Sequence, residues 1–306
     1  MSEWIGGYKR MTPMQTVGSG SARWCIVSQG LERFFLKEFL SPVYPAQEES
    51  ELGRRQRERC EAFERRKLRL YEAIACVIGD TLVPVIDFFR CERKYYAVSE
   101  AMPDSHITAE EIIAFPAEEK RKVLFDAALC LQRLHTQGVV HADLKPDHLL
   151  LLKRPEGYHL RLIDLDSGFL TDDPPKEERE MEGDPAFLAP EAFLRMIGHE
   201  TTLGPKLDTF AFGAIVHVVW TGKMPSFDHE KYSYLYEAAL EGGDITLSDE
   251  LPAQWHAAVR RMFCADPADR PCDAQVTALF EAEEPSETLT TDRPINGLSR
   301  LMRRGV

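Results

Sequence analysis

The feature that most constrains this chain is a polar segment, Val139-Val-His-Ala-Asp-Leu-Lys-Pro-Asp-His148, which runs directly into the apolar run Leu149–Leu152. A second acidic segment, Leu162-Ile-Asp-Leu-Asp-Ser-Gly168, overlaps the end of the next apolar run, Leu160–Leu165. Short apolar runs of this kind are consistent with buried strands. The two acidic segments carry the candidate chemistry of the chain.

Length and charge limit the classes of protein to which the chain can belong. It has 306 residues, of which 44% are hydrophobic and 28% charged, as in an ordinary globular protein. That length suggests two structural units or one domain with two lobes, with a large buried core. The chain carries 37 Lys and Arg against 50 Asp and Glu, a net charge of −13. This balance argues against nucleic-acid and anionic-membrane binding, because contact with phosphate needs a basic surface.

Cysteine use and the absence of long apolar stretches indicate the compartment. The seven cysteines are scattered singly, without a Cys-x-x-Cys pair, which favours reduced thiols over a disulfide framework or a zinc site. The first ten residues, Met1–Arg10, lack the apolar stretch of a signal peptide, and no run is apolar enough for a membrane span. We therefore expect a cytoplasmic protein.

The N-terminal part is predicted to form a small strand-rich lobe. Residues 23–40 are typical of two strands with a turn between them, and β-like runs follow at Leu82–Phe89 and Tyr95–Met102. A long charged segment that ends near Cys76 separates these two groups of strands. Its apolar side chains recur at helical spacing: Cys60, Phe63, Leu70 and Ile74. Its Arg and Glu residues suit a solvated face, so one long helix is expected here.

Beyond Pro103 the chain becomes mainly helical. Residues 118–137 show an amphipathic pattern, and Gly138 is a helix stop. An acidic, Pro-containing loop spans Gly168–Pro185, and helical stretches continue to about Glu281. The expected divisions are an N-terminal extension, a small lobe, a large lobe and a mobile tail: 1–13, 14–102, 103–282 and 283–306.

The two acidic segments resemble the catalytic loop (HRDLKPxN) and the metal-binding DFG segment of eukaryotic-type serine/threonine protein kinases. Further motifs of that family follow in the same order over roughly residues 14–282. They are a glycine-rich loop (Val17–Cys25), a strand lysine (Lys37), the end of an activation segment (Gly183–Glu191), a large-lobe helix and its exit (Asp208–Gly213, Thr221–Phe227) and a late arginine motif (Asp266–Pro271). The resemblance is to a divergent member, of a kind that would suit a bacterial eukaryotic-like kinase. It implies an α+β, bilobal protein-kinase-like fold, with a small β-rich N-lobe containing one long helix and a larger, mainly helical C-lobe.

The resemblance also implies which residues bind ATP. Gly18 and Gly20 would let backbone N–H groups approach the triphosphate, and Val17 and Cys25, at the two ends of the loop, would also contact the nucleotide. Arg23 stands where the family has its third glycine, and could itself reach a phosphate.

In the hinge, the carbonyl of Glu100 and the N–H of Met102 would meet adenine. Lys37 would hold the α- and β-phosphates and would need an acidic partner on the long helix. We expect Glu64 to be that partner, with Glu61 as the alternative. Without such a role, either glutamate would simply belong to a solvated charged face of the helix.

For the transfer step, the resemblance assigns Asp143 to the substrate hydroxyl proton and Lys145 to the γ-phosphate. Asp164 would bridge Mg²⁺ to the phosphates. Asp208 would accept backbone N–H groups of the catalytic loop and hold its shape. Asp184 stands where serine/threonine kinases usually carry a threonine, and could pair with Lys145.

Two departures concern the metal site. His148 replaces the asparagine that is the second metal ligand of the family, and Asp166 replaces the glycine of DFG. Magnesium prefers oxygen, whereas imidazole suits softer transition metals. One metal could suffice, Asp166 or Asp147 could supply oxygen, Mn²⁺ could be preferred, or His148 could be a packed residue in an impaired site.

A third departure concerns regulation. Ala142 replaces the arginine that the family neutralises with an activation-segment phosphate, and Gly168–Pro185 holds one hydroxyl residue, Thr171, among many acids. We therefore expect activity without activation-loop phosphorylation, with the loop ordered by itself or by a regulatory partner. Its charge could favour basic protein substrates. The alternative is that the loop is simply solvated and its acids have no binding role.

Three functions remain open at this stage. The first is an ATP-dependent serine/threonine protein kinase, supported by the complete set of charged residues and by Lys145 two positions after Asp143. The second is a pseudokinase that acts as an ATP-binding or scaffold module. The third is a small-molecule phosphotransferase, against which stand the Ala189-Pro-Glu191, Asp208 and Arg270 elements that build a platform for protein substrates.

Overall fold

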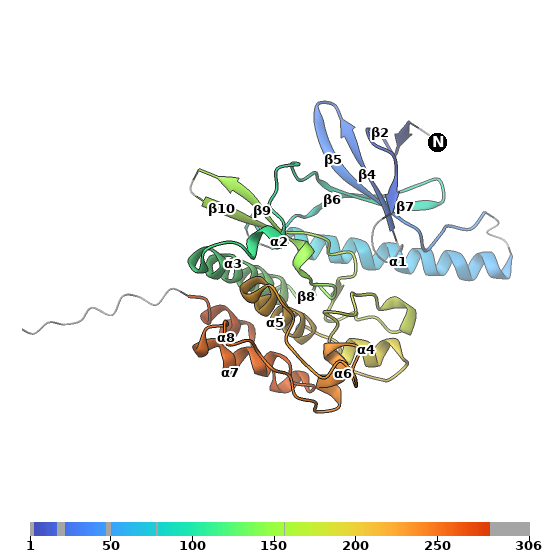
Figure 1. Cartoon of the computed structure of the whole chain (residues 1–306). Coiled ribbons are helices and arrows are strands. Elements are labelled where there is room, and N and C mark those ends of the chain that lie inside the picture. Colours follow the sequence, from blue (N-terminus) through green and yellow to red (C-terminus); the bar gives the residue numbers. More distant parts are fainter. Residues whose placement is uncertain (1–2, 17–21, 47–49, 78, 156, 282–306) are drawn as a thin grey trace, which may run out of the picture.

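The computed structural model describes residues 3–16, 22–46, 50–77, 79–155 and 157–281. The chain folds into a small upper lobe built on a sheet and a larger, mainly helical lower lobe (Figure 1). The connection between the lobes follows the last strand of the sheet, which ends at Glu100. The α+β, bilobal fold expected from the sequence is confirmed.

The small lobe is built on a seven-stranded antiparallel sheet in the order β1-β2-β4-β5-β7-β6, with β3 paired to β4. Its strands are β1 (Trp4–Ile5), β2 (Tyr8–Arg10), β3 (Gln15–Thr16), β4 (Ala22–Gln29), β5 (Glu32–Phe39), β6 (Val85–Cys91) and β7 (Lys94–Glu100). Gly30, with a φ of 62°, closes the β4–β5 hairpin in a left-handed conformation that glycine adopts readily. Residues from the expected N-terminal extension, 1–13, contribute β1 and β2 to this sheet.

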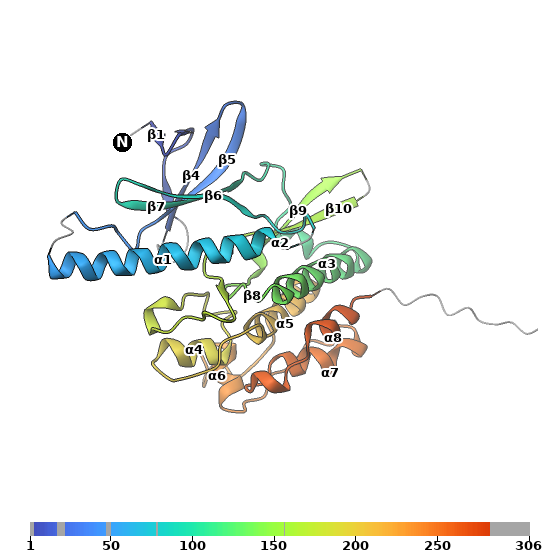
Figure 2. The same ribbon diagram turned by 180° about the vertical axis from the view of Figure 1, so that it is seen from behind.

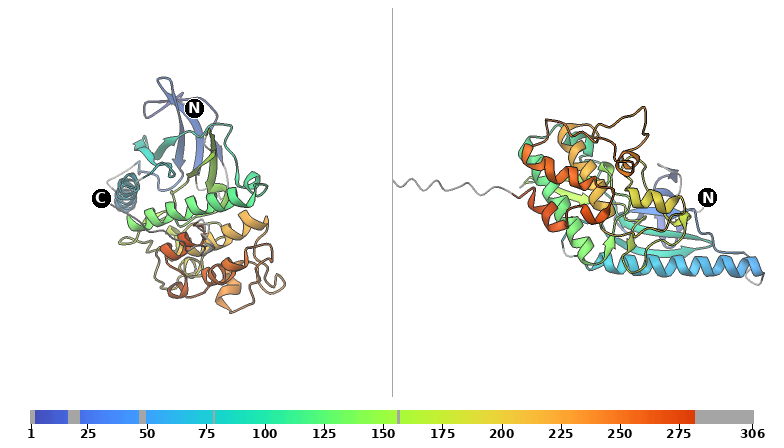
Figure 3. Two further views of the ribbon diagram at one scale, coloured as in Figure 1. Left: turned by 90° about the vertical axis from the view of Figure 1, so that its left-hand side faces the viewer. Right: turned by 90° about the horizontal axis from the view of Figure 1, so that it is seen from below.

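Helix α1 (Glu51–Ala75) lies under the sheet, and its N-terminal half projects beyond the rest of the lobe (Figures 2 and 3). Ser50 caps the helix, because its side chain accepts the N–H of Gly53 at 2.9 Å. The buried residues of α1 follow the predicted stripe: Gly53, Cys60, Lys67, Leu70, Tyr71 and Ile74. A lysine therefore lies within an otherwise largely apolar face.

The large lobe contains seven α-helices among its described residues. They are α2 (Ala109–Ile112), α3 (Ala117–Thr136), α4 (Pro190–Met196), α5 (Lys206–Thr221), α6 (Leu235–Leu240), α7 (Ala253–Met262) and α8 (Asp273–Ala278). Two short ribbons and three 3₁₀ turns connect them: β8 (Val139–Val140) with β11 (Phe169–Leu170), β9 (Leu149–Arg154) with β10 (Gly157–Leu162), η1 (Pro146–His148), η2 (Glu178–Glu180) and η3 (Pro267–Asp269). Helix α3 covers the predicted 118–137 within one residue at each end. The two ribbons hold the acidic segments between α3 and the sheet (Figure 1).

Two apolar clusters hold the molecule together. The larger runs from Phe39 and α1 through α3 to the almost fully buried helix α5, so it joins the lobes behind the acidic segments. The smaller lies on the opposite face of the sheet, around Tyr8, Val27 and Leu36. Among the described residues, no helix has the length and apolarity needed to cross a membrane.

Candidate active site

Asp208, at the start of α5, anchors the polar segment that follows β8. Its carboxylate accepts the N–H of His141 at 2.7 Å and the N–H of Ala142 at 2.9 Å. Ala142 has a φ of 67°, a left-handed conformation that costs a residue with a side chain about 1–3 kcal/mol. The two hydrogen bonds hold this strained turn in place, so the predicted role of Asp208 is confirmed.

A histidine to which the sequence assigned no role completes the anchor. Nε2 of His135 lies 2.9 Å from Asp208 Oδ2, and its Nδ1 lies 2.9 Å from Asp273 Oδ1. Burial alone would lower the pKa of His135, but the two carboxylates outweigh it and raise the pKa to about 9. Burial would raise the pKa of Asp208, but His135 reverses this and lowers it. A charged His135 therefore balances the buried carboxylate that shapes the loop.

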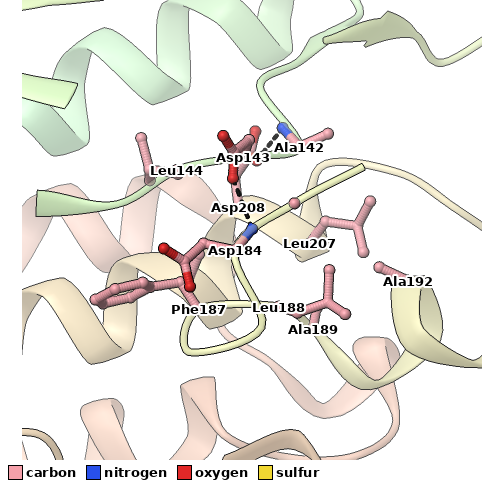
Figure 4. A pocket seen from close by; sticks show the side chains of 12 residues that line it. Ala142, Asp143, Leu144, Asp184, Phe187, Leu188, Ala189, Ala192, Leu207 and Asp208 are labelled. Carbon is pink, nitrogen blue, oxygen red and sulfur yellow. Dashed lines mark hydrogen bonds between the residues drawn. The ribbon is translucent and has the colours of Figure 1, made fainter. Parts of the chain in front are cut away.

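Asp143 and Lys145 lie together on the anchored loop. Asp143 Oδ1 accepts the N–H of Asp184 at 2.9 Å, and Lys145 Nζ lies 3.7 Å from Asp143 Oδ2 and 3.9 Å from Asp184 Oδ2. Figure 4 shows Asp143 and Asp184 at a small pocket that Phe187 and Leu188 also line. Burial raises the pKa of Asp143, and the charge of Lys145 opposes that rise. The expected pairing of Asp184 with Lys145 is present.

Lys37, on β5, reaches the second acidic segment. Its Nζ lies 2.9 Å from Asp164 Oδ1 and 2.6 Å from Asp166 Oδ2, and its side chain is 20% exposed. Burial pulls the pKa of Lys37 down, but the carboxylates of Asp166 and Asp164 outweigh it and raise the pKa above its ordinary value. Lys37 is therefore a charged group held between two carboxylates of one segment.

The prediction that Glu64 is the partner of Lys37 is wrong in this structure. Glu64 Oε1 accepts the hydroxyl of Tyr95 at 2.6 Å and lies 3.9 Å from Arg90. The alternative, Glu61, lies 3.8 Å from Arg57, one helical turn away. Glu64 lies two helical turns before Tyr71 on the same side of α1, and Glu61 lies one turn earlier still. Both glutamates are therefore displaced along the helix axis from the residues that meet the acidic segment.

The residues of α1 that do meet the acidic segment are Lys67 and Tyr71. Lys67 Nζ donates to the main-chain carbonyl of Asp166, and the Tyr71 hydroxyl donates to Asp166 Oδ1 at 3.2 Å. The sequence held a signal for Lys67, because it occupies the predicted apolar stripe three residues before Leu70. A lysine within a buried apolar stripe needs a polar partner, and here the main-chain carbonyl of Asp166 is that partner.

Asp164 and His148 face each other at the expected metal position. His148 Nε2 lies 3.7 Å from Asp164 Oδ2, and Asp164 has a φ of 63°. Burial lowers the pKa of His148 to about 3, so the imidazole is neutral near pH 7. Burial would raise the pKa of Asp164, but Lys37 holds it below its usual range. Within the described residues, Nδ1 of His148 is buried without a hydrogen-bond partner.

This donor set fits a divalent ion that is shared with a nucleotide. Across the described ranges, no group of three or more His, Cys, Asp and Glu side chains is arranged to hold a metal ion. Magnesium is commonly bound through one or two carboxylates together with substrate phosphates, and Asp164 supplies such a carboxylate. The neutral imidazole of His148 adds a ligand that suits Mn²⁺ better than Mg²⁺.

The prediction that Cys25 contacts a nucleotide is wrong. Cys25 is opposite Leu36 in the β4–β5 pairing and is fully buried in the cluster on the outer face of the sheet. Arg23 points to the same outer face, where its guanidinium donates to Glu38, so it is not directed at a phosphate. Neighbouring residues of a strand point to opposite faces, so an offset of one residue reverses the assignment.

Trp24 and Phe35 occupy the cleft face instead. Trp24 is directly opposite Lys37, and Phe35 is two residues before Lys37 on the same strand. Their rings stack, with centroids 5.3 Å apart and an interplanar angle of 26°. Any base bound beside Lys37 would therefore contact the stacked rings of Trp24 and Phe35.

The other nucleotide-binding predictions have different outcomes. Val17, Gly18 and Gly20 lie outside the described residues. Glu100 and Met102 are placed between the lobes, and the Glu100 carboxylate pairs with Arg161 of β10. Their backbone contacts to adenine remain predictions.

Ion pairs link α1 to the acidic loop that follows β11. Arg66 lies 2.6 Å from Glu180, and Arg69 lies 2.8 Å from Asp172 and 3.6 Å from Asp173. Burial would raise the pKa of Glu180, but backbone hydrogen bonds and Arg66 outweigh it and lower the pKa. Asp173 and Glu180 are therefore tied to α1, whereas four other acids of the loop are exposed, as the solvated-loop alternative expects: Asp172, Glu177, Glu178 and Glu182.

Comparison with known proteins agrees with this geometry. Residues 55–280 match the family model described as protein kinase domain. The chain is 28% identical over 167 residues to MAP kinase-interacting serine/threonine-protein kinase mnk-1 of Caenorhabditis elegans, covering 49% of this chain and 23% of that protein. It is 29% identical over 205 residues to Hormonally up-regulated neu tumor-associated kinase homolog B of Xenopus laevis, covering 64% and 31%. It is 28% identical over 143 residues to Calcium-dependent protein kinase 6 of Arabidopsis thaliana, covering 46% and 25%.

The chain thus spans about a quarter to a third of the length of these relatives. Among solved structures, the kinase domain of Mycobacterium tuberculosis PknI, as a double mutant, matches with a TM-score of 0.60. That match covers 90% of this chain and 95% of the other at 17% identity, so it bears on the fold alone. These relatives all carry the titles of protein kinases, and the pseudokinase and small-molecule alternatives find no support among them.

Proposed function

Because the chain belongs to the protein kinase family, we propose that it transfers the γ-phosphoryl group of ATP to serine and threonine hydroxyls of proteins. The observation that carries the proposal is the Asp143–Lys145 pair on a loop anchored by Asp208, with Lys37 and Asp164 paired beside it. These side chains supply a proton acceptor, two cations and a metal-binding carboxylate. Phosphoryl transfer needs little more, because its catalysis is mainly positioning and charge stabilisation.

Each side chain has a separate part in this proposal. Asp143 orients the attacking hydroxyl and takes its proton as the new oxygen–phosphorus bond forms, while the bond from the γ-phosphorus to the β–γ bridging oxygen breaks and ADP leaves. Lys145, beside Asp143, offsets the negative charge on the transferred group, and Lys37 holds the α- and β-phosphates. A magnesium ion held by Asp164 would neutralise charge between the phosphates. The imidazole of His148 supports use of Mn²⁺ as well.

The expected substrate is a protein segment with basic residues. Asp184 lies next to the pocket at Asp143, and Glu182 and Asp147 are exposed nearby in sequence. A cationic residue beside the phosphorylated hydroxyl would meet these carboxylates, of which Glu182 and Asp147 are exposed. Lys145, two residues after Asp143, supports hydroxyls of serine and threonine over tyrosine. A protein partner that controls the enzyme would fit the projecting half of α1, whose surface is rich in arginine.

We infer further that activity does not depend on phosphorylation of the activation segment. The ion pairs of Arg66 and Arg69 with Glu180, Asp172 and Asp173 already tie that segment to α1. In a phosphorylated segment an added phosphate would supply such a tie by pairing with arginines. Here carboxylates encoded in the sequence take that place.

The test is transfer of labelled phosphate from ATP to the protein itself and to a generic basic protein, with Mg²⁺ or Mn²⁺. The Asp143→Ala variant is the control, and its melting temperature is compared with that of the wild type. Incorporation that Asp143→Ala abolishes is the expected result. Binding of ATP without any transfer would overturn the proposal and leave a nucleotide-binding module.

A further inference from the structure

We propose that Asp166 is the residue that positions Lys37 for the nucleotide, and that Lys67 and Tyr71 of α1 hold Asp166 in place. This proposal rests on the proposed function, because Lys37 is the side chain assigned to the phosphates. It moves the acidic partner of Lys37 from the long helix, where the family resemblance placed it, to the segment that follows Asp164. Asp166 is a positioning residue in this scheme, since it acts through Lys37.

Every polar side-chain atom of Asp166 has a partner. Oδ2 lies 2.6 Å from Lys37 Nζ, and Oδ1 accepts the Tyr71 hydroxyl at 3.2 Å. The main-chain carbonyl of Asp166 accepts an N–H of Lys67. The carboxylate is 16% exposed, so these contacts form largely away from solvent. A carboxylate fixed at both oxygens and at its own backbone fixes the ammonium that it binds.

Lys67 takes the place in which an acidic helix residue is expected. It is 9% exposed, and its ammonium lies 5.5 Å from the centre of the Phe39 ring and 5.7 Å from that of Phe63. A buried ammonium without a counter-charge is costly, and the carboxylates that act on it are Asp166, Glu182 and Asp164. The charges are thus reversed relative to the expected arrangement: the helix carries the cation, and the segment after Asp164 carries the anion.

This assignment replaces the metal role expected for Asp166 from the sequence. A divalent ion bound by Asp166 would have to share an oxygen with the ammonium of Lys37 at Oδ2 or with the Tyr71 hydroxyl at Oδ1, and each of these contacts would weaken. Asp164, in contrast, uses one oxygen for Lys37 and directs the other toward His148. The two carboxylates therefore have separate roles: Asp164 would bind the metal, and Asp166 holds Lys37.

The experiment compares four variants: Asp166→Asn, Asp166→Gly, Lys67→Glu and the double variant Lys67→Glu/Asp166→Gly. The last restores a helix glutamate together with the glycine of the DFG motif. We expect each single variant to lower kcat/KM for ATP by roughly 10- to 100-fold, because Lys37 loses its fixed position. We expect the double variant to recover most of that loss. A role confined to packing would make the two changes additive.

The matched control is Glu58→Gln, which neutralises an exposed carboxylate on the same helix. It is expected to leave kcat/KM and the dissociation constant for ATP unchanged. Melting temperatures of all variants show whether a loss of activity reflects unfolding. Unchanged kcat/KM and ATP affinity in Asp166→Asn would overturn the proposal. So would a defect that a higher concentration of Mg²⁺ or Mn²⁺ repairs, because that result assigns Asp166 to the metal.

The outcome can be separated from that of the proposed function. If the wild type binds ATP but transfers no phosphate, the same variants are compared by their dissociation constants for ATP. If it binds no ATP, a cycle of Lys37→Met, Asp166→Asn and the double variant is measured by thermal unfolding. Additive shifts in melting temperature would contradict the pair, and coupled shifts would establish it without any nucleotide.

Discussion

The guanidinium of Arg270 and the carboxylate of Glu191 form a bidentate ion pair inside the large lobe. Nη1 donates to Oε1 at 2.7 Å, Nη2 donates to Oε2 at 2.8 Å, and the residues are 2% and 4% exposed. Arg270 also donates to the carbonyls of Cys264 and Ala265, so its charge is fully partnered. The pair thus connects the late arginine motif with the Ala-Pro-Glu sequence. It joins the end of the activation segment to the C-terminal helices.

Replacement of Arg270 by leucine should destabilise the protein severely. The change leaves the Glu191 carboxylate buried without its counter-charge, and breaking a buried pair in this way costs about 3–5 kcal/mol. Urea denaturation measures the free energy of unfolding of the variant and the wild type. Lys223→Leu, at a side chain that is 73% exposed, should change it by less than about 0.5 kcal/mol. A loss no larger for Arg270→Leu would contradict the prediction.

Stability should fall between neutral and alkaline pH because of His135. Its pKa in the folded state is about 9 against an ordinary 6.5, so its contribution is complete below pH 6.5 and is lost as the pH rises through about 9. The difference between these values corresponds to about 3 kcal/mol. Denaturation curves across this range, compared with those of His135→Gln, isolate the effect. Equal pH dependence in both proteins would exclude His135 as its source.

The catalytic loop and its anchor could be predicted from the sequence because the motifs are local and their spacing is fixed. Asp143 and Lys145 are two residues apart, and the backbone between them determines their relation. Asp208 and Arg270 are distant in sequence, but each lies in a recognisable motif with one geometric role. The two-lobed fold followed from the order of the motifs along the chain.

The partner of Lys37 could not be predicted in the same way. It depends on the position of α1 along its own axis relative to the sheet, because Glu64 and Lys67 are one turn apart on the same side of the helix. That position is set by packing on the sheet. A helical wheel places both near the buried side. The replacement of glycine by Asp166 was visible, but its meaning depends on Lys67, more than ninety residues earlier.

The residues of β4 that point into the cleft were mispredicted for a related reason. The glycine-rich motif was aligned so that Cys25 pointed into the cleft, whereas the pairing of β4 with β5 places Trp24 opposite Lys37. Strand side chains alternate, so a difference of one residue exchanges the two faces completely. Local spacing alone does not fix that register.

Glu64→Gln should lower the stability of the protein without changing its KM for ATP. Glu64 accepts a hydrogen bond from Tyr95, which is fully buried. The amide oxygen of glutamine still accepts this bond but without the charge, and the difference between a charged and a neutral acceptor is about 1 kcal/mol. Since Glu64 contacts Tyr95 and Arg90 and not Lys37, KM for ATP should stay at its wild-type value. Thermal unfolding and initial-rate kinetics on the same preparation test both statements. A raised KM in a folded variant would restore Glu64 as the partner of Lys37.

Nucleotide binding should change the fluorescence of Trp24. The Trp24 ring stacks on Phe35 on the cleft face, and a bound base would contact this aromatic pair. Titration with ATP should therefore alter the tryptophan emission, and Trp24→Phe should abolish that change while Phe35 still offers a stacking surface. The other three tryptophans remain as internal references. If ATP alters the tryptophan emission of Trp24→Phe as much as that of the wild type, the base binds elsewhere.

Activity should depend on the arginines of α1 and not on the hydroxyl of Thr171. Arg66 and Arg69 pair with acids of the activation segment, so the double variant Arg66→Ala/Arg69→Ala should free that segment and lower kcat. Individual exposed pairs are worth about 0–1 kcal/mol, so the double variant should lower kcat by roughly tenfold while global stability changes little. Thr171→Ala should retain full activity, because no phosphate is needed there. Phosphate transfer by enzyme expressed without other kinases measures all three proteins. Loss of activity in Thr171→Ala would assign control to phosphorylation after all.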